Sequence, residues 1–235
     1  MSERDIVIFD RQHYGKPGSA SMPHSITCDM GVDCAPPCPV ATGPDMGAAY
    51  DLDHDGRIED HEREANLTPH YYLPAKRMLG VRGYQVFVLD QGWYSSRHRE
   101  ARRLAMLYPH SHVVYVACHV NAGGGKYSLV ISDERSISGS MIAEEVCHAM
   151  RSEDIPGIDR YITRQGTPTA WTNGLNTIKG IYEGPGNLAG ICFEPYFLDQ
   201  REHAYAATEE GGERIAAALV RGLINYFANR RQGVY

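Results

Sequence analysis

Long hydrophobic runs and an excess of positive charge are both absent from this sequence of 235 residues. The first apolar segment, Ile6 to Phe9, is too short for an export signal, and no later stretch approaches the roughly 20 apolar residues that a membrane span needs. The formal net charge is −6, so the chain lacks the basic surface that neutralises nucleic-acid phosphates. We therefore expect a chain made in the cytoplasm, without membrane insertion and without nucleic acid as a partner.

Cysteine is also too sparse for a disulfide scaffold, with six in the whole chain. Dense disulfide frameworks belong to small secreted domains, whereas a chain of this length can bury a full core without them. Three cysteines lie in apolar segments and are expected in the core: Cys118, Cys147 and Cys192. The others lie in a loop rich in proline and glycine, where free thiols or one local disulfide are expected and a small second metal site is the alternative: Cys28, Cys34 and Cys38.

Short β-branched runs alternate along the chain with amphipathic stretches, and no internal repeat is visible. Strands are expected at residues 6–9, 84–89, 113–118, 127–132, 177–182 and 189–193. Helical periodicity marks residues 60–79, 96–107, 138–150 and 212–227. Strands that alternate with helices predict a single α/β domain over residues 1–235, with a mainly parallel twisted sheet of about six strands covered by helices on both faces. A long irregular insertion is expected at residues 14–50, and loops dominate residues 151–188.

Chemically reactive side chains follow the ends of the predicted strands. His13 comes after the first strand, His119 after the third and Glu194 directly after the last, while Glu64 lies on the first helix. The carboxyl ends of parallel strands meet along one edge of a sheet, so these four residues can converge. Two histidines and one carboxylate leave a fourth position open on Zn²⁺, as in catalytic zinc sites, and a second carboxylate can act as a general base. For any one histidine alone, an ordinary polar role is the simpler interpretation.

Three segments surround these residues: Ile8-Phe-Asp-Arg-Gln-His-Tyr-Gly15, Ala117-Cys-His-Val-Asn-Ala122 and Phe193-Glu-Pro-Tyr-Phe-Leu-Asp199. In this order they resemble the zinc-dependent N-acetylmuramoyl-L-alanine amidases of the third amidase type, which occur as bacterial cell-wall enzymes and phage endolysins. The first segment departs from the family pattern, because Arg11 and Gln12 stand where Pro-Gly usually precedes the histidine.

The resemblance implies a fold, a substrate and a set of site residues. The substrate would be peptidoglycan, cut at the amide bond between N-acetylmuramic acid and L-alanine. His13, Glu64 and His119 would bind zinc, and Glu194 would be the catalytic carboxylate. The enzyme would act on the cell wall, either as a phage lysin or as a mature secreted form.

Glu59 and Glu62 lie close to Glu64 and are the alternatives for the zinc-binding carboxylate. Glu64 shares one helical face with residues that follow at steps of three or four: Leu67, Thr68, Tyr71, Ala75, Met78 and Leu79. Glu62 is out of phase with that stripe. We therefore expect Glu64 to point toward the sheet.

A second metal pattern occupies residues 51–62, Asp-Leu-Asp-His-Asp-Gly-Arg-Ile-Glu-Asp-His-Glu. This segment fits the EF-hand calcium loop, with a glycine at the sharp turn and oxygen ligands expected from Asp51, Asp53, Asp55, the Arg57 carbonyl and Glu62. Oxygen ligands of this number suit Ca²⁺ better than Zn²⁺. An acidic loop in solvent is the alternative. A calcium site would use Glu62 and leave Glu64 for zinc.

Other functions fit the same residues. A zinc peptidase or deacetylase could use two histidines and one glutamate in the same way. A calcium-stabilised wall-binding or phage structural module with a lapsed active site would bind wall material without zinc. The sequence predicts neither the oligomeric state, nor the peptidoglycan chemotype, nor a phage or bacterial source.

Overall fold

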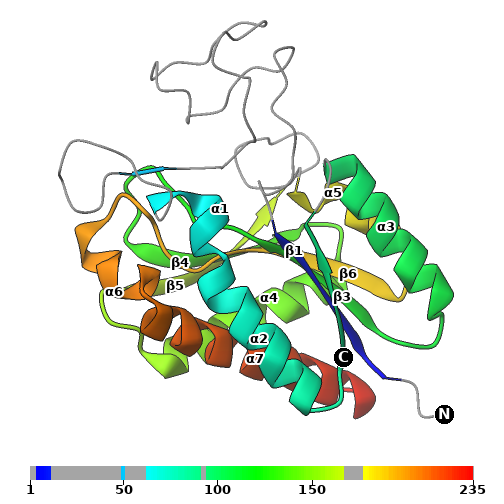
Figure 1. Ribbon diagram of the computed structural model, residues 1–235. Helices are drawn as coiled ribbons and strands as arrows, with labels where there is room; N and C mark the ends of the chain where they lie inside the picture. Colours follow the sequence, from blue (N-terminus) through cyan, green and yellow to red (C-terminus); the bar gives the residue numbers. More distant parts are fainter. Residues whose placement is uncertain (1–3, 12–48, 51–61, 91–93, 167–176, 235) are drawn as a thin grey trace, which may run out of the picture.

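A single twisted sheet with helices on both faces forms the part of the chain that the computed structural model describes, residues 4–11, 49–50, 62–90, 94–166 and 177–234 (Figure 1). The strand order in this part is β2-β1-β3-β6-β4-β5. The strands are β1 (Ile6–Arg11), β2 (Gln85–Leu89), β3 (Val113–Cys118), β4 (Tyr127–Asp133), β5 (Arg160–Gly166) and β6 (Leu188–Glu194). The predicted α/β class and mainly parallel sheet are confirmed.

One strand pair reverses the direction of the sheet. β1 pairs in parallel with β2 and β3, and β3 pairs in parallel with β6. β4 is antiparallel to β6, with Leu129 opposite Glu194, and β5 is parallel to β4. The first residues of β4 and β5 therefore lie at the same edge of the sheet as the last residues of β1, β3 and β6. Because the sequence predicts the catalytic residues at these strand ends, we call this edge the catalytic edge.

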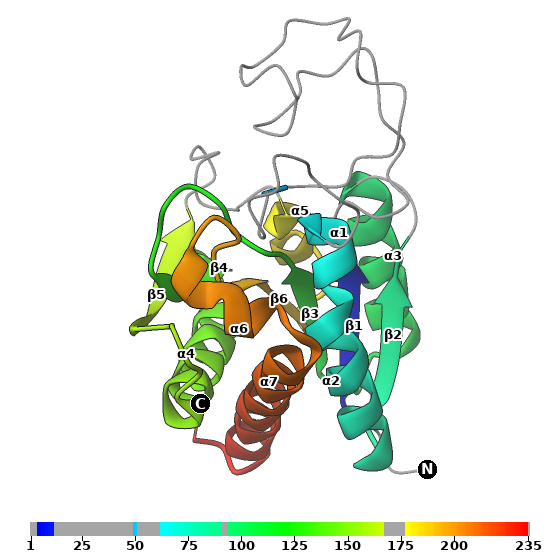
Figure 2. The ribbon, with the colours of Figure 1, turned by 60° about the vertical axis from the view of Figure 1, so that its left-hand side comes forward.

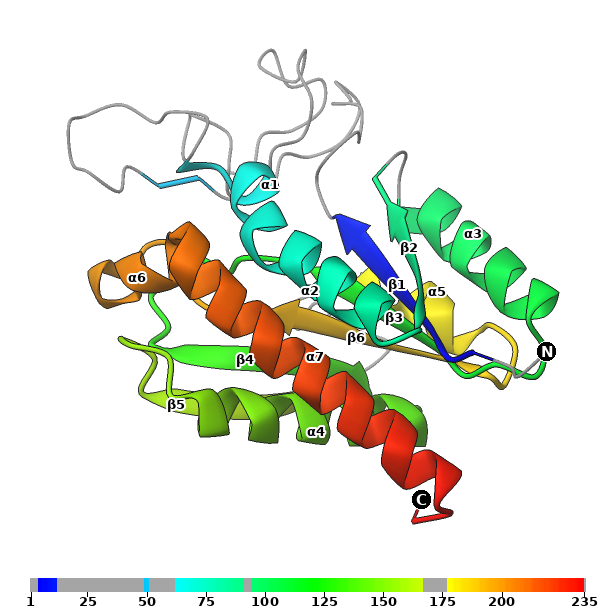
Figure 3. The same cartoon turned by 60° about the horizontal axis from the view of Figure 1, so that its bottom comes forward.

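Three long helices cover one face of the sheet: α2 (Pro69–Val81), α4 (Ile137–Glu153) and α7 (Glu209–Arg231). α7 lies between the other two and contacts both (Figures 2 and 3). α4 and α7 begin with N-caps, because the Ser136 hydroxyl accepts from the Gly139 N–H and the Thr208 hydroxyl accepts from the Gly211 N–H. Gly222 of α7 lies so close to α4 that a Cβ would fall 2.6 Å from the Val146 Cα, so this crossing requires glycine.

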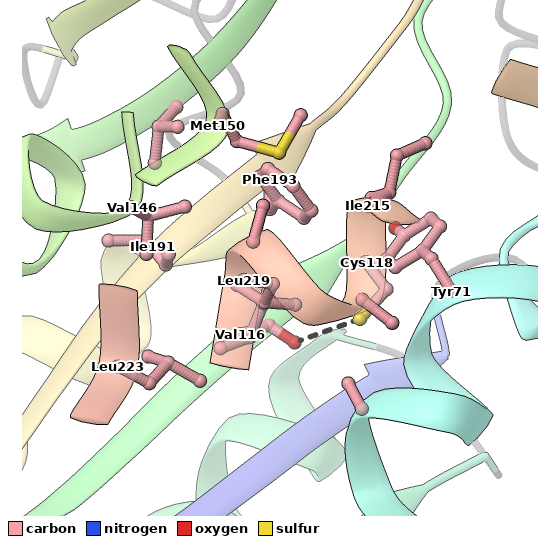
Figure 4. Packing of buried hydrophobic residues seen from close by; sticks show 14 of the residues in the cluster. Tyr71, Val116, Cys118, Val146, Met150, Ile191, Phe193, Ile215, Leu219 and Leu223 are labelled. Atoms are coloured by element: carbon pink, nitrogen blue, oxygen red, sulfur yellow. Dashed lines mark hydrogen bonds between the residues drawn. The ribbon is translucent and has the colours of Figure 1, made fainter. Parts of the chain in front are cut away.

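The core under these helices is large and almost entirely apolar. Alternate residues of β1, β3 and β6 point into it, as the period of a strand dictates. Figure 4 shows Leu219 and Leu223 of α7 packed with Val146 of α4 over Ile191 of β6. The expected burial of Cys118, Cys147 and Cys192 is confirmed, and all three are free thiols.

The opposite face of the sheet is covered by α3 (Tyr94–Leu107) and the short α5 (Lys179–Tyr182). Its core is smaller and takes the other set of alternate strand residues, including Ile6 and Ile8 of β1. Two further short helices, α1 (Glu64–Leu67) and α6 (Ala204–Ala207), lie near the catalytic edge together with a 3₁₀ turn at Arg201–His203.

Three expectations about the elements need correction. The predicted strand at 177–182 is wrong: Ile178 and Ile181 both lie in the smaller core, which their three-residue spacing allows in a helical turn but not in a strand. β5 was not predicted, because only Tyr161 and Gly166 are buried in it and no apolar alternation marks it. The helix expected at 60–79 is divided into α1 and α2, since Pro69 starts the second helix at its first turn, where a missing N–H costs nothing.

Several expectations lie outside the described residues. The insertion at 14–50 is described only at its last two residues, and the calcium loop only at Glu62. Among the helices that the structure describes, none is both long and apolar enough to cross a membrane.

Candidate metal centre and catalytic site

Two of the predicted zinc ligands meet at the catalytic edge. His119 follows β3, and its backbone N–H donates to the Phe193 carbonyl across the sheet at 3.0 Å. Glu64 is the first residue of α1. The His119 Nδ1 and the Glu64 Oε1 are 2.7 Å apart, and the same carboxylate oxygen accepts from the Val120 N–H at 3.0 Å. Both residues are buried, with exposed fractions of 8% for His119 and 3% for Glu64.

Helices α1 and α2 bring Glu64 to this place. The stripe that the sequence predicted, from Leu67 through Tyr71 to Leu79, is buried, except for Met78, which is partly buried. The Tyr71 hydroxyl donates to the His119 carbonyl at 3.0 Å, which ties α2 to the end of β3. Glu62 is fully buried as well, but the carboxylate that contacts His119 is that of Glu64.

Arg11 links the end of β1 to the same helix. Its guanidinium donates to the Ala65 carbonyl through Nη2 at 2.8 Å and through Nε at 3.2 Å. Ala65 is the neighbour of Glu64, so the position of this carboxylate depends on the last residue of β1. This contact depends on the guanidinium donors of arginine, which most other side chains at this position could not replace.

Glu194, the last residue of β6, completes the group. Its Oε2 accepts from the Asn121 side-chain amide, and the Cys192 thiol lies 3.8 Å from its Oε1. Burial raises the pKa of Glu194 to about 7, opposed by the charge of His119 and increased further by the Glu64 carboxylate. A carboxyl group with a pKa near neutrality can both accept and return a proton.

The loops after β3 and β6 hold one another in place. Asn121 donates its backbone N–H to the Tyr196 carbonyl at 3.0 Å and accepts from the Leu198 N–H at 2.7 Å. Beyond it, the Asp199 carboxylate accepts from the N–H groups of Gly123 and Gly124 at 2.9 and 2.8 Å. Both glycines have φ in the left-handed region, +113° and +83°, which side-chain-bearing residues rarely adopt. Asn121 is therefore fixed from both sides while its side chain reaches Glu194.

A buried polar cluster lies beneath the end of β1. Arg97 of α3 donates to the Asp10 carboxylate at 2.5 Å and to the Arg11 carbonyl at 2.7 Å, and the Tyr115 hydroxyl donates to the same carboxylate. Burial raises the pKa of Tyr115 well above its usual value, and the charge of Asp10 adds to the rise, so the phenol remains a donor. This cluster fixes the strand end that leads into His13.

The remaining predicted ligands lie outside the described residues: His13, Asp51, Asp53, Asp55 and Arg57. Within the ranges that the structure describes, no three histidine, cysteine or acidic side chains form a metal cluster. Cys28, Cys34 and Cys38 are also outside those ranges. The pair that is described, one imidazole nitrogen and one carboxylate oxygen, consists of donors that suit zinc. His13 stays a prediction as the third ligand.

Sequence reasoning missed three residues that organise the site, namely Asp10, Arg97 and the side chain of Asn121. The signal for Asp10 is its place directly after a fully apolar run, where a buried charge needs a partner. Arg97 has no such signal, because its helix is rich in arginine throughout.

Comparison of the sequence with family models and with curated proteins gives no match. Comparison of the structure gives several. The amidase AmiC2 of Nostoc punctiforme is 17% identical with a TM-score of 0.61, and the match covers 95% of this chain and 97% of that one. An N-acetylmuramoyl-L-alanine amidase of Clostridium difficile 630 is 16% identical with a TM-score of 0.64, over 97% and 98% of the two chains. The catalytic domain of the CD27L endolysin, which targets Clostridium difficile, is 14% identical with a TM-score of 0.56, over 94% and 97%.

These similarities extend over nearly the whole length of each chain. At such low identity they show that the fold is the one seen in N-acetylmuramoyl-L-alanine amidases. Function depends on the side chains at the site, since one fold can carry many chemistries.

Proposed function

We propose that this chain is a zinc-dependent peptidoglycan amidase that hydrolyses the bond between N-acetylmuramic acid and L-alanine. The observation that carries the proposal is the contact of Glu64 with His119 beside Glu194, at the catalytic edge of an amidase-like fold. The substrate places the site of action in the cell wall, after synthesis in the cytoplasm.

His13, Glu64 and His119 would hold the zinc ion. A neutral imidazole and a carboxylate are regular zinc donors, and three protein ligands leave one position for substrate chemistry. The 2.7 Å approach of the His119 Nδ1 to the Glu64 Oε1 brings two of these donors within reach of one ion. A bound zinc ion would supply Lewis-acid polarisation of the scissile carbonyl.

Glu194 would act as the general base and then as the general acid. Its carboxylate takes a proton from the attacking water as the new C–O bond forms at the lactyl carbonyl carbon. It then gives that proton to the amine of L-alanine as the C–N bond breaks. Asn121 holds one oxygen of this carboxylate and would orient the group for the proton transfer. A pKa of Glu194 of about 7 suits both halves of this cycle.

Two isosteric variants test the roles together. Glu194→Gln keeps the shape but cannot accept a proton, so it should retain zinc and lose a factor of about 10² to 10⁴ in rate. Glu64→Gln should lose zinc along with activity, because a neutral amide is a poorer zinc ligand. Zinc content is measured by elemental analysis, and the product is identified as a free L-alanine amino terminus with muramic acid intact.

The outcomes separate the alternatives. An active Glu194→Gln variant, or zinc loss in that variant but not in Glu64→Gln, contradicts the assigned roles. A different product from the wild-type protein would point to another zinc peptidase or to a deacetylase. Wall binding without zinc and without any product would point to a lapsed module.

We also propose that residues 51–62 bind one calcium ion through Asp51, Asp53, Asp55, Arg57 and Glu62. Support comes from the ends of this segment, which are brought together: Ala49 and Arg63 form an antiparallel bridge, and the Tyr50 N–H donates to the Glu62 carbonyl at 3.3 Å. The fully buried Glu62 lies two residues before Glu64. Bound calcium would neutralise the clustered carboxylates and fix the start of α1.

Selective calcium removal tests this second site. We expect a lower melting temperature and a weaker zinc affinity, since α1 carries Glu64. Asp51→Ala and Asp53→Ala should weaken calcium binding but retain zinc in a calcium-rich buffer. An unchanged melting temperature and activity after calcium removal would rule out the structural role.

A further inference from the structure

Two arginines share the face of the sheet on which Glu194 lies. Glu194 is opposite Leu129 of β4, and Leu129 is opposite Ile162 of β5, so the three residues form one row across the sheet. Arg160 and Arg164 stand two residues before and after Ile162, and the period of a strand puts them on the same face. With strands about 4.8 Å apart, β5 lies about 10 Å from Glu194.

Both guanidinium groups converge on one aromatic ring. The Arg160 guanidinium carbon lies 5.7 Å from the ring centroid of Tyr127, and that of Arg164 lies 5.6 Å from it. The Arg164 Nη2 is also 3.5 Å from the Tyr127 hydroxyl. The ring is held in turn by Phe197, in an edge-on contact with centroids 4.8 Å apart. Tyr127, the first residue of β4, therefore lies within cation–π distance of both guanidinium groups.

The charge of these two arginines is not balanced within the described part of the chain. No carboxylate among the described residues lies within ion-pair distance of either guanidinium, and both side chains are exposed. This stands out in a chain of net charge −6. Other arginines do pair with an acid: Arg103 with Glu100, Arg135 with Asp133, and Arg221 with Glu153.

We propose that Arg160 and Arg164, held on Tyr127, form a subsite for a carboxylate on the peptide side of the scissile amide. The planar guanidinium group binds carboxylates through paired N–H donors, and the aromatic ring gives an apolar floor for the peptide chain. An extended peptide advances about 3.3 Å per residue, so a distance of about 10 Å places the carboxylate on the second or third residue after the cleaved bond. Arg164 also lies close enough to Glu194 to lower its pKa, which agrees with this distance. The proposal rests on the amidase function proposed above.

Matched substrates test the subsite. Two N-acetylmuramoyl tripeptides of the same sequence are compared, one with all carboxylates free and one with all of them amidated. Charge-assisted hydrogen bonds should favour the free acid by about tenfold or more in kcat/KM with the wild-type protein. In the double variant Arg160→Gln/Arg164→Gln this preference should fall to nearly one, through loss of activity on the free acid alone. Arg82→Gln removes the same kind of exposed charge at the far end of α2 and should keep the full preference.

Equilibrium binding separates failure of the subsite from failure of the proposed function. The two tripeptides are titrated into Glu194→Gln, with and without the two arginine substitutions. If the wild-type protein cleaves neither tripeptide, the amidase function fails, but a free-acid preference in binding that depends on the arginines still supports the subsite. Equal cleavage and binding of the two tripeptides, a preference retained by the double variant, or an equal loss on both substrates would overturn the subsite.

Discussion

The two faces of the sheet differ in how many polar groups are buried on them. The face under α2, α4 and α7 is a large apolar core, and few polar side chains are buried in it. The face under α3 and α5 is smaller, and it contains the ion pair of Asp10 with Arg97, joined by Tyr115. Glu194, Tyr127 and the β5 arginines belong to this second face.

This difference indicates which contacts stabilise the fold and which contacts position the side chains of the site. Apolar burial is strong but has no direction, so it can hold a sheet together without fixing a side chain to within an ångström. Hydrogen bonds to a buried charge are directional, and they lie beneath the strand end that carries the proposed zinc site. Substitutions of apolar residues of the first face that lie away from His119 and Glu64 should therefore change stability alone. Substitutions in the polar cluster of the second face should change the site as well.

The largest effect is expected from Asp10→Ala. It leaves the Arg97 guanidinium buried without its carboxylate, which costs about 3–5 kcal/mol, and it should also lower zinc occupancy. Urea unfolding and metal analysis measure the two effects. Glu100→Ala, which breaks the exposed pair with Arg103, is the control and should change little. If Asp10→Ala unfolds at the same urea concentration as the wild-type protein, the polar cluster does not stabilise the fold as we expect.

Leu219→Ala tests the apolar face. Leu219 is fully buried under α7, and its truncation should cost about 2–5 kcal/mol of unfolding free energy. Activity per folded molecule should be unchanged, because no polar group of the site depends on it. Leu107→Ala, at a position that is 59% exposed, should be nearly neutral. A loss of zinc from folded Leu219→Ala would show that the two faces are not separable in this way.

Asn121→Ala should affect catalysis more than stability. Without the amide donor, the Glu194 carboxylate loses its orientation, and the rate should fall by between about 10-fold and 100-fold. Removing a donor from the ionised form also raises the pKa of Glu194. Since the base must be deprotonated, the acid limb of the kcat/KM profile should move to higher pH. Asn229→Ala, which removes a hydrogen bond from a side-chain amide to Glu145 far from the site, should leave the pH profile unchanged. An unshifted acid limb in Asn121→Ala would contradict the positioning role.

The smallest effect is expected from Arg11→Met, which keeps the side-chain stem and removes both bonds to the Ala65 carbonyl. Zinc affinity should weaken by about tenfold, as is usual when a group that orients a ligand is lost. Arg82→Met removes a similar bond to the Met78 carbonyl, far from the site, and is the matched control. Competition with a zinc chelator measures the zinc affinity of both variants. Equal affinities would mean that the hydrogen bonds from Arg11 do not help to position α1.

Much of the fold followed from the sequence because the central strands are buried on both sides. β3 was predicted at its observed bounds, and β1 and β6 were predicted to within two residues at each end, since continuous apolar runs mark such strands. β5 was not predicted, because this edge strand with one exposed face has no such run. The error at 177–182 came from reading apolar residues as a strand when their spacing of three fits one turn of helix.

The site was predictable only in part. His119 and Glu194 follow buried strands, and the stripe on α2 indicated that Glu64 points toward the sheet. The contacts of Asn121 with Glu194 and of Arg11 with α1 depend on loops and helices that meet only in the folded molecule. No local pattern encodes them. His13 and the calcium ligands remain predictions.

The strand order also has a consequence for how the chain is synthesised. Among the described strands β6 comes last in the sequence, yet it lies in the middle of the sheet, between β3 and β4. Until residue 194 has left the ribosome, β3 and β4 lack the strand that lies between them in the fold, so neither can form its backbone hydrogen bonds with β6. The strand that joins them also delivers Glu194. A partly synthesised chain therefore lacks the proposed general base. The chain can become an active hydrolase only when β6 pairs with β3 and β4 and completes the sheet.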